Sequence, residues 1–197
     1  MTDLNTRQAD YPIDPIFLER WSPRAFTDET MTKEQLMTLF EAARWAPSAS
    51  NMQPWSFVYA LRGSETWDKL FGLVMEGNQR WVKSAAALVF IISKTHNRSP
   101  EGEMKPIFSH AFDAGAAWHA LSLQAISSGF HAHAMGGIER EKAQHVLGVP
   151  EGYRVEAGIA IGKRAPADTL PDDLKAREVK SSRKPASEFV FEGHFAA

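Results

Sequence analysis

The chain has no cysteine, little net charge and no long apolar run, and each absence excludes a class of protein. Without cysteine there are no disulfides, thiolate metal sites or cysteine nucleophiles. A formal net charge of −2 gives no general attraction to nucleic acid or anionic membranes, so any anion site must be local. The longest apolar run, 85–92, is too short to span a bilayer, and residues 1–10 lack the apolar region of a secretory signal. These absences predict a cytoplasmic protein with neither a membrane nor a nucleic-acid partner.

Several common catalytic and cofactor motifs are missing as well. There is no Gly-x-Gly-x-x-Gly for a Rossmann nucleotide site and no serine nucleophile elbow. The segment 158–164 is one residue too short for a phosphate loop and has Arg164 where that motif needs Ser or Thr. His131 and His133 share a strand face, but no third ligand stands at a useful spacing, so we predict no metal site. No cluster of histidines or carboxylates points to acid–base catalysis by the protein itself.

The length and the pattern of apolar residues predict one layered domain. A chain of 197 residues with 44% hydrophobic content is sufficient for one core spanning residues 1–197. Apolar periodicity and end signals predict helices at 33–45, 64–73, 108–128 and 139–147, and strands at 56–61, 85–92, 131–135 and 154–161. The polar segment 93–107 is expected to be a long loop. Alternating helices and strands indicate an α/β or α+β layered fold.

The C-terminal 30 residues or so, from about 168 to 197, have an unusual composition for a tail. A charged stretch with Pro171 is followed by apolar residues close together: Phe189, Val190, Phe191 and Phe195. Exposing such side chains in a free tail is unfavourable. We therefore expect an extended arm that packs on a surface, which the surface of a second subunit could provide.

The segment from Ala46 to Trp55 places small polar groups between a predicted helix and a predicted strand. Ser48, Asn51 and Gln53 offer hydrogen-bond donors and acceptors, while two prolines, Pro47 and Pro54, stiffen the backbone. We call this segment the ledge. A stiff surface of short polar side chains suits a flat, hydrogen-bonding ring.

A second cluster lies upstream, in the sequence Arg20-Trp21-Ser22-Pro23-Arg24. In an extended segment, which Pro23 favours, side chains two residues apart leave one face, so Arg20, Ser22 and Arg24 would converge. Guanidinium groups match phosphate oxygens, which favours a phosphate clamp. Taken alone, the same residues are equally compatible with a solvated basic turn.

Together these segments make the chain resemble the nitroreductase family of flavin-dependent oxidoreductases over nearly its whole length. The resemblance rests on four motifs in the family's order. They are Arg-x-Ser-x-Arg at 20–24, Pro-Ser-x-x-Asn-x-Gln-Pro-Trp at 47–55, Met135-Gly136-Gly137, and the late basic pair Arg183-Lys184. The resemblance implies an α+β fold with a mixed, mainly antiparallel sheet flanked by helices, and a homodimer whose C-terminal arm packs on the partner.

The resemblance also implies a non-covalent FMN site. Arg20, Trp21 through its backbone, Ser22, Arg24 and Arg183 would surround the phosphate and ribityl chain. Pro47, Ser48 and Asn51 would line the ring, with Ser48 and Asn51 supplied across the dimer interface, and Asn51 and Gln53 carry donors and acceptors that can meet the pyrimidine edge. Met135, Gly136 and Gly137 would pass the N5 edge, although Gly-Gly pairs are also common in ordinary turns.

The implied activity is hydride transfer from NADH or NADPH through FMN N5 to a nitroaromatic, quinone or related small-molecule acceptor, in a ping-pong mechanism. The chemistry would be carried by the cofactor, with no catalytic side chain. Alternatives are a specialised flavoenzyme of the same fold, either a dehalogenase or an oxygen-using enzyme, and a non-catalytic flavin-binding module. The sequence decides neither the nicotinamide nor the acceptor.

Overall fold

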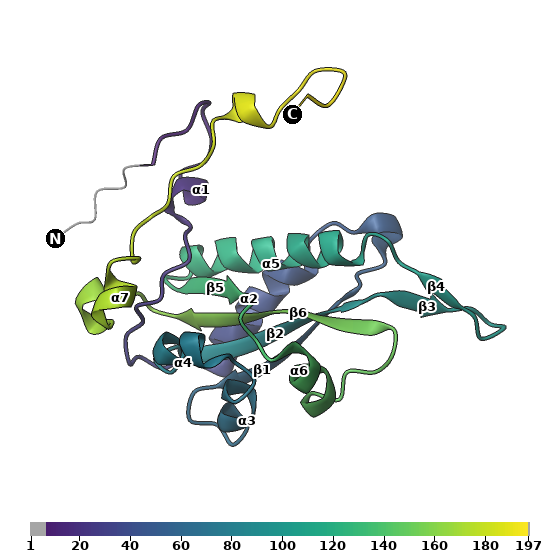
Figure 1. Cartoon of the computed structure of the whole chain (residues 1–197), viewed down its shortest axis with the longest axis horizontal. Helices are drawn as coiled ribbons and strands as arrows, with labels where there is room; N and C mark the ends of the chain where they lie inside the picture. The colour runs from purple at the N-terminus through teal and green to yellow at the C-terminus, as the bar shows by residue number, and fades with distance from the viewer. Residues whose placement is uncertain (1–6, 197) are drawn as a thin grey trace.

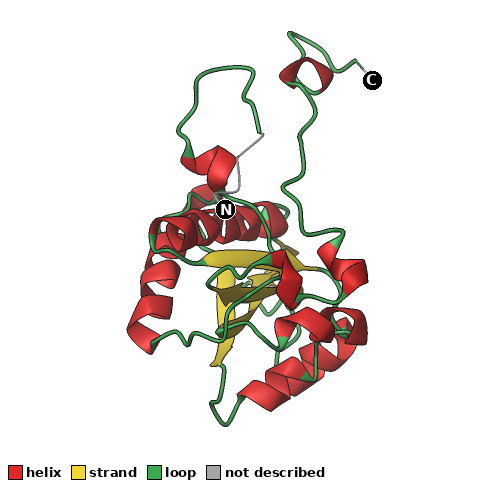
Figure 2. Cartoon of the chain, turned by 90° about the vertical axis from the view of Figure 1, so that its left-hand side faces the viewer, coloured by secondary structure: helices red, strands yellow, loops and turns green. Residues whose placement is uncertain are grey.

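The computed structural model describes residues 7–196, which form an antiparallel sheet with helices on both faces (Figures 1 and 2). The four strands are ordered β1-β2-β6-β5, and every neighbouring pair is antiparallel. Their bounds are Trp55–Leu61 for β1, Ala87–Lys94 for β2, His131–Met135 for β5 and Tyr153–Gly162 for β6. The predicted α+β layered fold is confirmed.

The central strand β2 shows why the sheet is covered on both faces. Its residues from Ala87 to Ser93 are all buried, as its unbroken apolar run predicts. Leu88 and Phe90 point into the core on one face, while Val89 and Ile91 point into the core on the other. Strand β5 pairs only with β6, so it lies at one edge of the sheet.

Two helices, α2 (Lys33–Arg44) and α5 (His110–Ser127), pack together on one face of the sheet. Thr32 and Gln35 form the predicted capping box at the start of α2. Helix α5 is buried only on the side that includes Ala114, Ala117 and Leu121. It is therefore less enclosed in the single chain than its apolar composition predicts.

The other face is covered by three shorter helices: α3 (Trp67–Phe71), α4 (Glu76–Val82) and α6 (Arg140–Val146). Helix α3 is shorter than the predicted helix 64–73. Helix α4 was not predicted because Gly77 and Asn78 are poor helix formers and no side chain caps its start. Its Trp81 is almost completely buried, so tertiary packing stabilises this helix where propensity does not.

The segment 93–107 differs from the predicted long loop. Strand β2 continues through Lys94, and a hairpin follows, with β3 at His96–Arg98 and β4 at Met104–Pro106 (Figure 1). The hairpin projects away from the layers. Most of its side chains are exposed, so it carries no alternating apolar pattern that could have revealed it.

The terminal segments lie at one end of the molecule and are tied together. Helix α1 (Ile16–Glu19) belongs to the first segment, and the last contains η2 (Ala167–Thr169), α7 (Asp172–Lys175) and η3 (Ala186–Glu188). The backbone N–H of Ala186 donates to Asp10 Oδ2 at 2.7 Å. Beyond α7 the chain extends away from the layers (Figure 1), as the predicted arm would.

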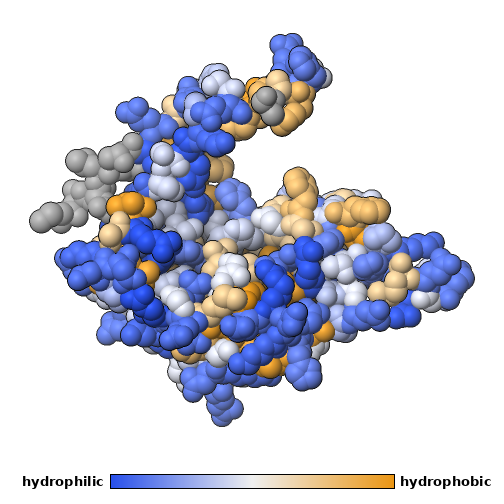
Figure 3. Space-filling model, in the orientation of Figure 1, coloured by the Kyte–Doolittle hydropathy of each residue, from blue (hydrophilic) through white to orange (hydrophobic). Residues whose placement is uncertain are grey.

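Large apolar side chains are exposed on the arm and around α5 (Figure 3). Phe108 and Phe112, at the start of α5, are 92% and 83% exposed, and Phe195 is 80% exposed. Exposed apolar groups gathered in this way are typical of interaction surfaces. No helix in residues 7–196 has the length and apolar character needed to cross a membrane.

Candidate functional site

The predicted phosphate clamp surrounds one cavity of about 360 Å³, called here the clamp cavity. Arg20, Trp21, Ser22 and Arg24 line it from the segment after α1, and Arg183 reaches it from the C-terminal segment. Arg20 Nη1 donates to Ser22 Oγ at 3.3 Å, so these two side chains leave the backbone on the same side. The structure thus brings together all five residues of the predicted clamp.

Sequence reasoning missed Arg7, which also lines the clamp cavity. Its Nη1 donates to the carbonyls of Leu18 at 3.2 Å and Arg20 at 2.7 Å, and its Nε donates to the carbonyl of Ser181 at 3.0 Å. Arg7 therefore joins the N-terminal segment to both walls of the cavity. No motif marks it, because these three partners are backbone carbonyls that only the fold brings near.

The clamp cavity is rich in positive charge, and the described residues of its lining include no Asp or Glu. Burial lowers the pKa of Arg20, and the nearby charges of Arg183 and Arg7 lower it further. Burial and the charge of Arg177 likewise lower the pKa of Arg24, with Glu178 opposing them. Cations that repel one another are stabilised by a bound anion, so the cavity fits a phosphate group.

Glu178 holds the clamp segment from outside the cavity. Its Oε1 accepts hydrogen bonds from the backbone N–H of Arg24 at 2.8 Å and of Ala25 at 2.9 Å. The contact joins the C-terminal segment to the clamp segment. It leaves the guanidinium of Arg24 available to the cavity, which that side chain lines.

Two histidines on β5 lie against this cationic region and are held neutral. His133 lines the cavity, and its Nδ1–H donates to the carbonyl of Pro23 at 2.9 Å. Burial, more than the neighbouring cations, lowers the pKa of His131 and of His133 to about 4. No metal-binding group of three or more His, Cys, Asp or Glu residues is found in residues 7–196, and we assign these histidines no ligand role.

The ledge has a strained backbone. Within residues 7–196 the non-glycine residues with positive φ are Ser50, Asn51 and Gln53, at 51°, 53° and 47°. Ser50 and Asn51 lie in the single turn η1 (Ala49–Asn51), and Gln53 follows two residues after it. Left-handed backbone at non-glycine residues is costly and persists where surrounding structure enforces it, often at functional sites.

Hydrogen bonds within the ledge explain how this conformation is kept. The backbone N–H of Gln53 donates to Ser48 Oγ at 3.0 Å, and Gln53 Nε2 donates to Asn51 Oδ1 at 3.0 Å. Asp113, which is buried in the first turn of α5, accepts from the backbone N–H of Ala49 at 3.3 Å. The side-chain amide of Gln53 thus holds the side chain of Asn51 in place. This contact comes in addition to the predicted contact of Gln53 with the ring.

The ledge and the clamp do not meet within one chain. No ledge residue lines the clamp cavity. The ledge is tied to the first turn of α5 through Asp113, whereas Phe17, just before the clamp, stacks on His119 further along the helix. Figure 1 shows the ledge turn and α1 towards different ends of α5. A site built from both needs the ledge of another subunit.

The Gly-Gly pair after β5 has two different roles. A Cβ at Gly137 would lie 2.3 Å from Asn78 Nδ2, whose amide also donates to the Gly137 carbonyl at 3.1 Å. Gly137 is therefore required by packing inside the protein. A Cβ at Gly136 would meet no atom within 4 Å, so this position borders open space.

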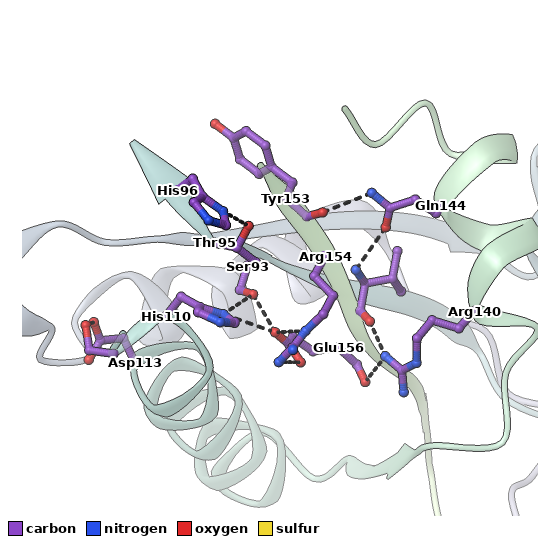
Figure 4. A network of polar contacts seen from close by, with 12 residues as sticks. Ser93, Thr95, His96, His110, Asp113, Arg140, Gln144, Tyr153, Arg154 and Glu156 are labelled. Carbon is purple, nitrogen blue, oxygen red and sulfur yellow. Dashed lines mark hydrogen bonds and ion pairs between the residues drawn. The ribbon is translucent and has the colours of Figure 1, made fainter. Parts of the chain in front are cut away.

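A polar network around the buried Ser93, near α5, was also missed (Figure 4). Ser93 Oγ contacts His110 Nδ1 at 2.8 Å and Glu156 Oε1 at 2.5 Å, and Arg154 Nη2 donates to Glu156 Oε2 at 3.0 Å. Burial alone would raise the pKa of Glu156, but hydrogen bonds from Arg154 and Ser93 lower it overall. The residues of this network come from β2, α5 and β6, and sequence spacing could not reveal that these elements meet.

The carboxylate of Glu156 lies beside a small apolar cavity. This cavity, of about 140 Å³, lies between α5 and the sheet and is lined by Trp118 on the helix and Ala134 on β5, among others. Because the carboxylate is already satisfied by Ser93 and Arg154, we read the network as support for the α5–sheet junction.

The chain belongs to the nitroreductase family. The model of the Nitroreductase family matches residues 18–80 and 73–163, which contain the clamp segment, the ledge and the Gly-Gly turn. Arg183 lies beyond the matched range.

Known proteins similar to this chain include flavin enzymes. A crystal structure described as an oxidoreductase containing FMN is 54% identical, with a TM-score of 0.95 over 100% of this chain and 99% of that one. The CLA biosynthesis enone reductase of Lactiplantibacillus plantarum is 30% identical over 82% of this chain and 91% of its own length. The NADPH:FMN oxidoreductase from Vibrio harveyi, solved in complex with NAD+, is 26% identical, with a TM-score of 0.70 over 92% and 77% of the two chains.

Proposed function

We propose that this protein is a homodimeric oxidoreductase that passes hydride from NADH or NADPH through FMN to a small acceptor such as a nitroaromatic or a quinone. The protein is an NAD(P)H-dependent FMN oxidoreductase of the nitroreductase family. The acceptor class, the ping-pong order and the residues that make up the site are what we propose beyond that. The observation that carries it is the clamp cavity, where Arg20, Arg24, Arg177 and Arg183 gather with no carboxylate among the described residues of the lining.

In this proposal the clamp holds the phosphate and ribityl end of FMN. Arg20 and Arg183 bind the phosphate oxygens, while Ser22, Arg24 and the backbone of Trp21 complete that end. Met135 and Gly136 border the ring near N5, where the open space beside Gly136 lets the backbone come close. Bound FMN supplies the two-electron redox chemistry, and the chain supplies position and charge.

The ring end is completed by the ledge of a second subunit. Pro47, Ser48, Asn51 and Gln53 of that subunit would line the ring, because the ledge lies apart from the clamp cavity within one chain. The exposed aromatic side chains at Phe108, Phe112 and along the arm favour such a dimer. An interface that builds the active site explains why so much apolar surface is exposed on one chain.

One binding slot that serves the nicotinamide and the acceptor in turn requires the first product to leave before the second substrate enters. Initial rates measured at several fixed NADPH and quinone concentrations should therefore give parallel double-reciprocal lines. Intersecting lines would contradict the ping-pong order. A flavin that NADH and NADPH leave oxidised under anaerobic conditions would instead indicate a non-catalytic flavin-binding module.

A further inference from the structure

A second cationic cavity adjoins the clamp cavity. This side cavity, of about 340 Å³, shares Arg7 and Arg183 with the clamp cavity and is otherwise lined by Gln8, Phe17, Leu18, Lys180 and Ser182. The shared residues show that the two cavities adjoin at Arg7 and Arg183. The side cavity lies between α1 and the C-terminal segment, which Arg7 joins through its bond to Ser181.

The two cavities together hold more positive charge than one flavin phosphate can neutralise. Their described linings contain no Asp or Glu and, apart from Arg7, hold five cations: Arg20, Arg24, Arg177, Lys180 and Arg183. A phosphate monoester carries about −1.5 to −2 charges near pH 7. Phosphate binding in the clamp therefore leaves excess positive charge for a second phosphate group.

Lys180 and Arg183 are suited to receive that second phosphate. In residues 7–196 neither side chain forms an ion pair with a carboxylate, and Arg183 Nη1 donates to Ser181 Oγ and the Ser182 carbonyl, both at 2.9 Å. These bonds fix the guanidinium and leave its other N–H groups for a ligand. Ser182 adds a hydroxyl-bearing residue to the same wall.

Phe17 gives the side cavity a flat apolar surface. Its ring stacks on His119 of α5, with the ring centroids 6.1 Å apart and the planes 18° from parallel. Burial, and then the charge of Arg20, lowers the pKa of His119, so this support is neutral near pH 7. With one face supported and 47% of the residue exposed, the ring can stack with an aromatic base.

We propose that the side cavity binds the adenylate end of NADPH, with Lys180 and Arg183 on the 2′-phosphate and Phe17 against the adenine. This inference rests on the proposed function, because it gives that function's nicotinamide substrate a second anchoring point. NADH has a neutral hydroxyl in place of the 2′-phosphate and gains less from the two cations. The enzyme therefore prefers NADPH.

The same chemistry, an adenosine carrying phosphate, also occurs in FAD. If the resident flavin were FAD, its adenylate would fill the side cavity and no preference between nicotinamides would arise there. Identification of the flavin released on denaturation separates the two sources, and release of FAD would overturn the proposal.

Binding is tested first without turnover. Calorimetry on the FMN-loaded protein compares 2′,5′-ADP with ADP, which has the same groups except for the position of one phosphate. The expected result is binding of 2′,5′-ADP at least about tenfold tighter than that of ADP, lost in Lys180→Ala and kept in Lys105→Ala. Lys105 is an exposed lysine of the β3–β4 hairpin, outside both cavities. Equal binding of the two nucleotides, or none, overturns the proposal.

Steady-state kinetics then separate phosphate recognition from base recognition. Lys180→Ala should lower kcat/KM for NADPH about tenfold and change that for NADH less than about twofold, with FMN content unchanged. Phe17→Ala should lower both values by a similar factor, since both substrates carry adenine. An equal loss for NADPH and NADH in Lys180→Ala would contradict 2′-phosphate recognition. A protein that contains FMN and turns over equally with both nicotinamides would overturn this inference alone, whereas a protein without flavin would overturn the proposed function.

Discussion

The guanidinium of Arg7 donates from Nη1 to the backbone carbonyl of Arg20 at 2.7 Å, and the Nε of the same side chain donates to Ser181 at 3.0 Å. One side chain thus connects the clamp segment with the C-terminal segment that carries Arg183. The anion-binding cavity is therefore assembled from both ends of the sequence. Binding of FMN should therefore depend on residues such as Arg7, which hold the two segments together, as much as on the residues of the clamp motif.

Removing a clamp arginine should weaken FMN binding more than it impairs chemistry. Arg20→Ala and Arg183→Ala each remove a charge-assisted hydrogen bond to phosphate, worth about 1.5–3 kcal/mol. The dissociation constant for FMN, measured by fluorescence titration of the FMN-free protein, should rise about tenfold to a hundredfold. Added FMN should restore much of the rate. Arg98→Ala, on the exposed hairpin, is the control, and unchanged affinity in both clamp variants would show that the clamp is misassigned.

A site shared between subunits should be restored by mixing two defective chains. Arg20→Ala disables the clamp and Asn51→Ala the ledge, so a heterodimer of the two chains contains one intact site and one site with both defects. Co-expressed chains carrying different affinity tags, purified through both tags and assayed without added FMN, should regain close to half of the wild-type rate per dimer. A heterodimer no more active than either parent would mean that clamp and ledge do not meet across an interface.

The C-terminal arm should be required for assembly. Truncation before Glu188 removes Phe189, Phe191 and Phe195, which are exposed in one chain and have no core to pack against. Sedimentation velocity should give twice the chain mass for the full protein and a larger monomer fraction for the truncated one, with reduced flavin content. Changing only Glu192 to Gln should leave the dimer intact. A truncated protein that remains a dimer and retains FMN would contradict this role for the arm.

Acid should destabilise the protein through the buried histidines. The pKa of His131 and of His133 is about 4 in the folded protein, below the value of about 6.5 expected in the unfolded chain. As the pH falls from 6.5 towards 4, the unfolded chain binds more protons, so the free energy of unfolding decreases; above pH 6.5 this contribution is constant.

Urea unfolding of the FMN-free protein at pH 7 and pH 5 measures this effect. His131→Leu removes a buried Nδ1 that has no hydrogen-bond partner among the described residues. It also removes a group that titrates in this range and should therefore reduce the loss of stability between the two pH values. His145→Leu, at an exposed position on α6, should not. An unchanged loss in His131→Leu would show that this histidine does not set the acid sensitivity.

The sequence predicted those features that local patterns encode. The run at 85–92 indicated a strand buried on both faces, and Thr32 with Gln35 indicated the start of α2; the structure confirms both. The spacing of Arg20, Ser22 and Arg24 predicted that these side chains converge, and all three line one cavity. Their roles towards FMN stay predictions that the variants above test.

The remaining features depend on contacts between distant residues. Arg7 binds backbone carbonyls, which no motif marks, and Ser93 meets Glu156 only because β2 and β6 are neighbours. Gly137 is fixed by Asn78 of a helix that local propensity did not predict. Such partners become visible only once the sheet order and helix packing are known.

The most direct test of the central claim is the identity of the flavin. The purified protein should be yellow, and denaturation should release FMN at about one molecule per chain, identified by chromatography against FMN and FAD standards. Anaerobic NADPH should bleach the bound flavin, and a quinone should restore its colour. A colourless protein that FMN cannot reconstitute, or one that releases FAD, would contradict the account.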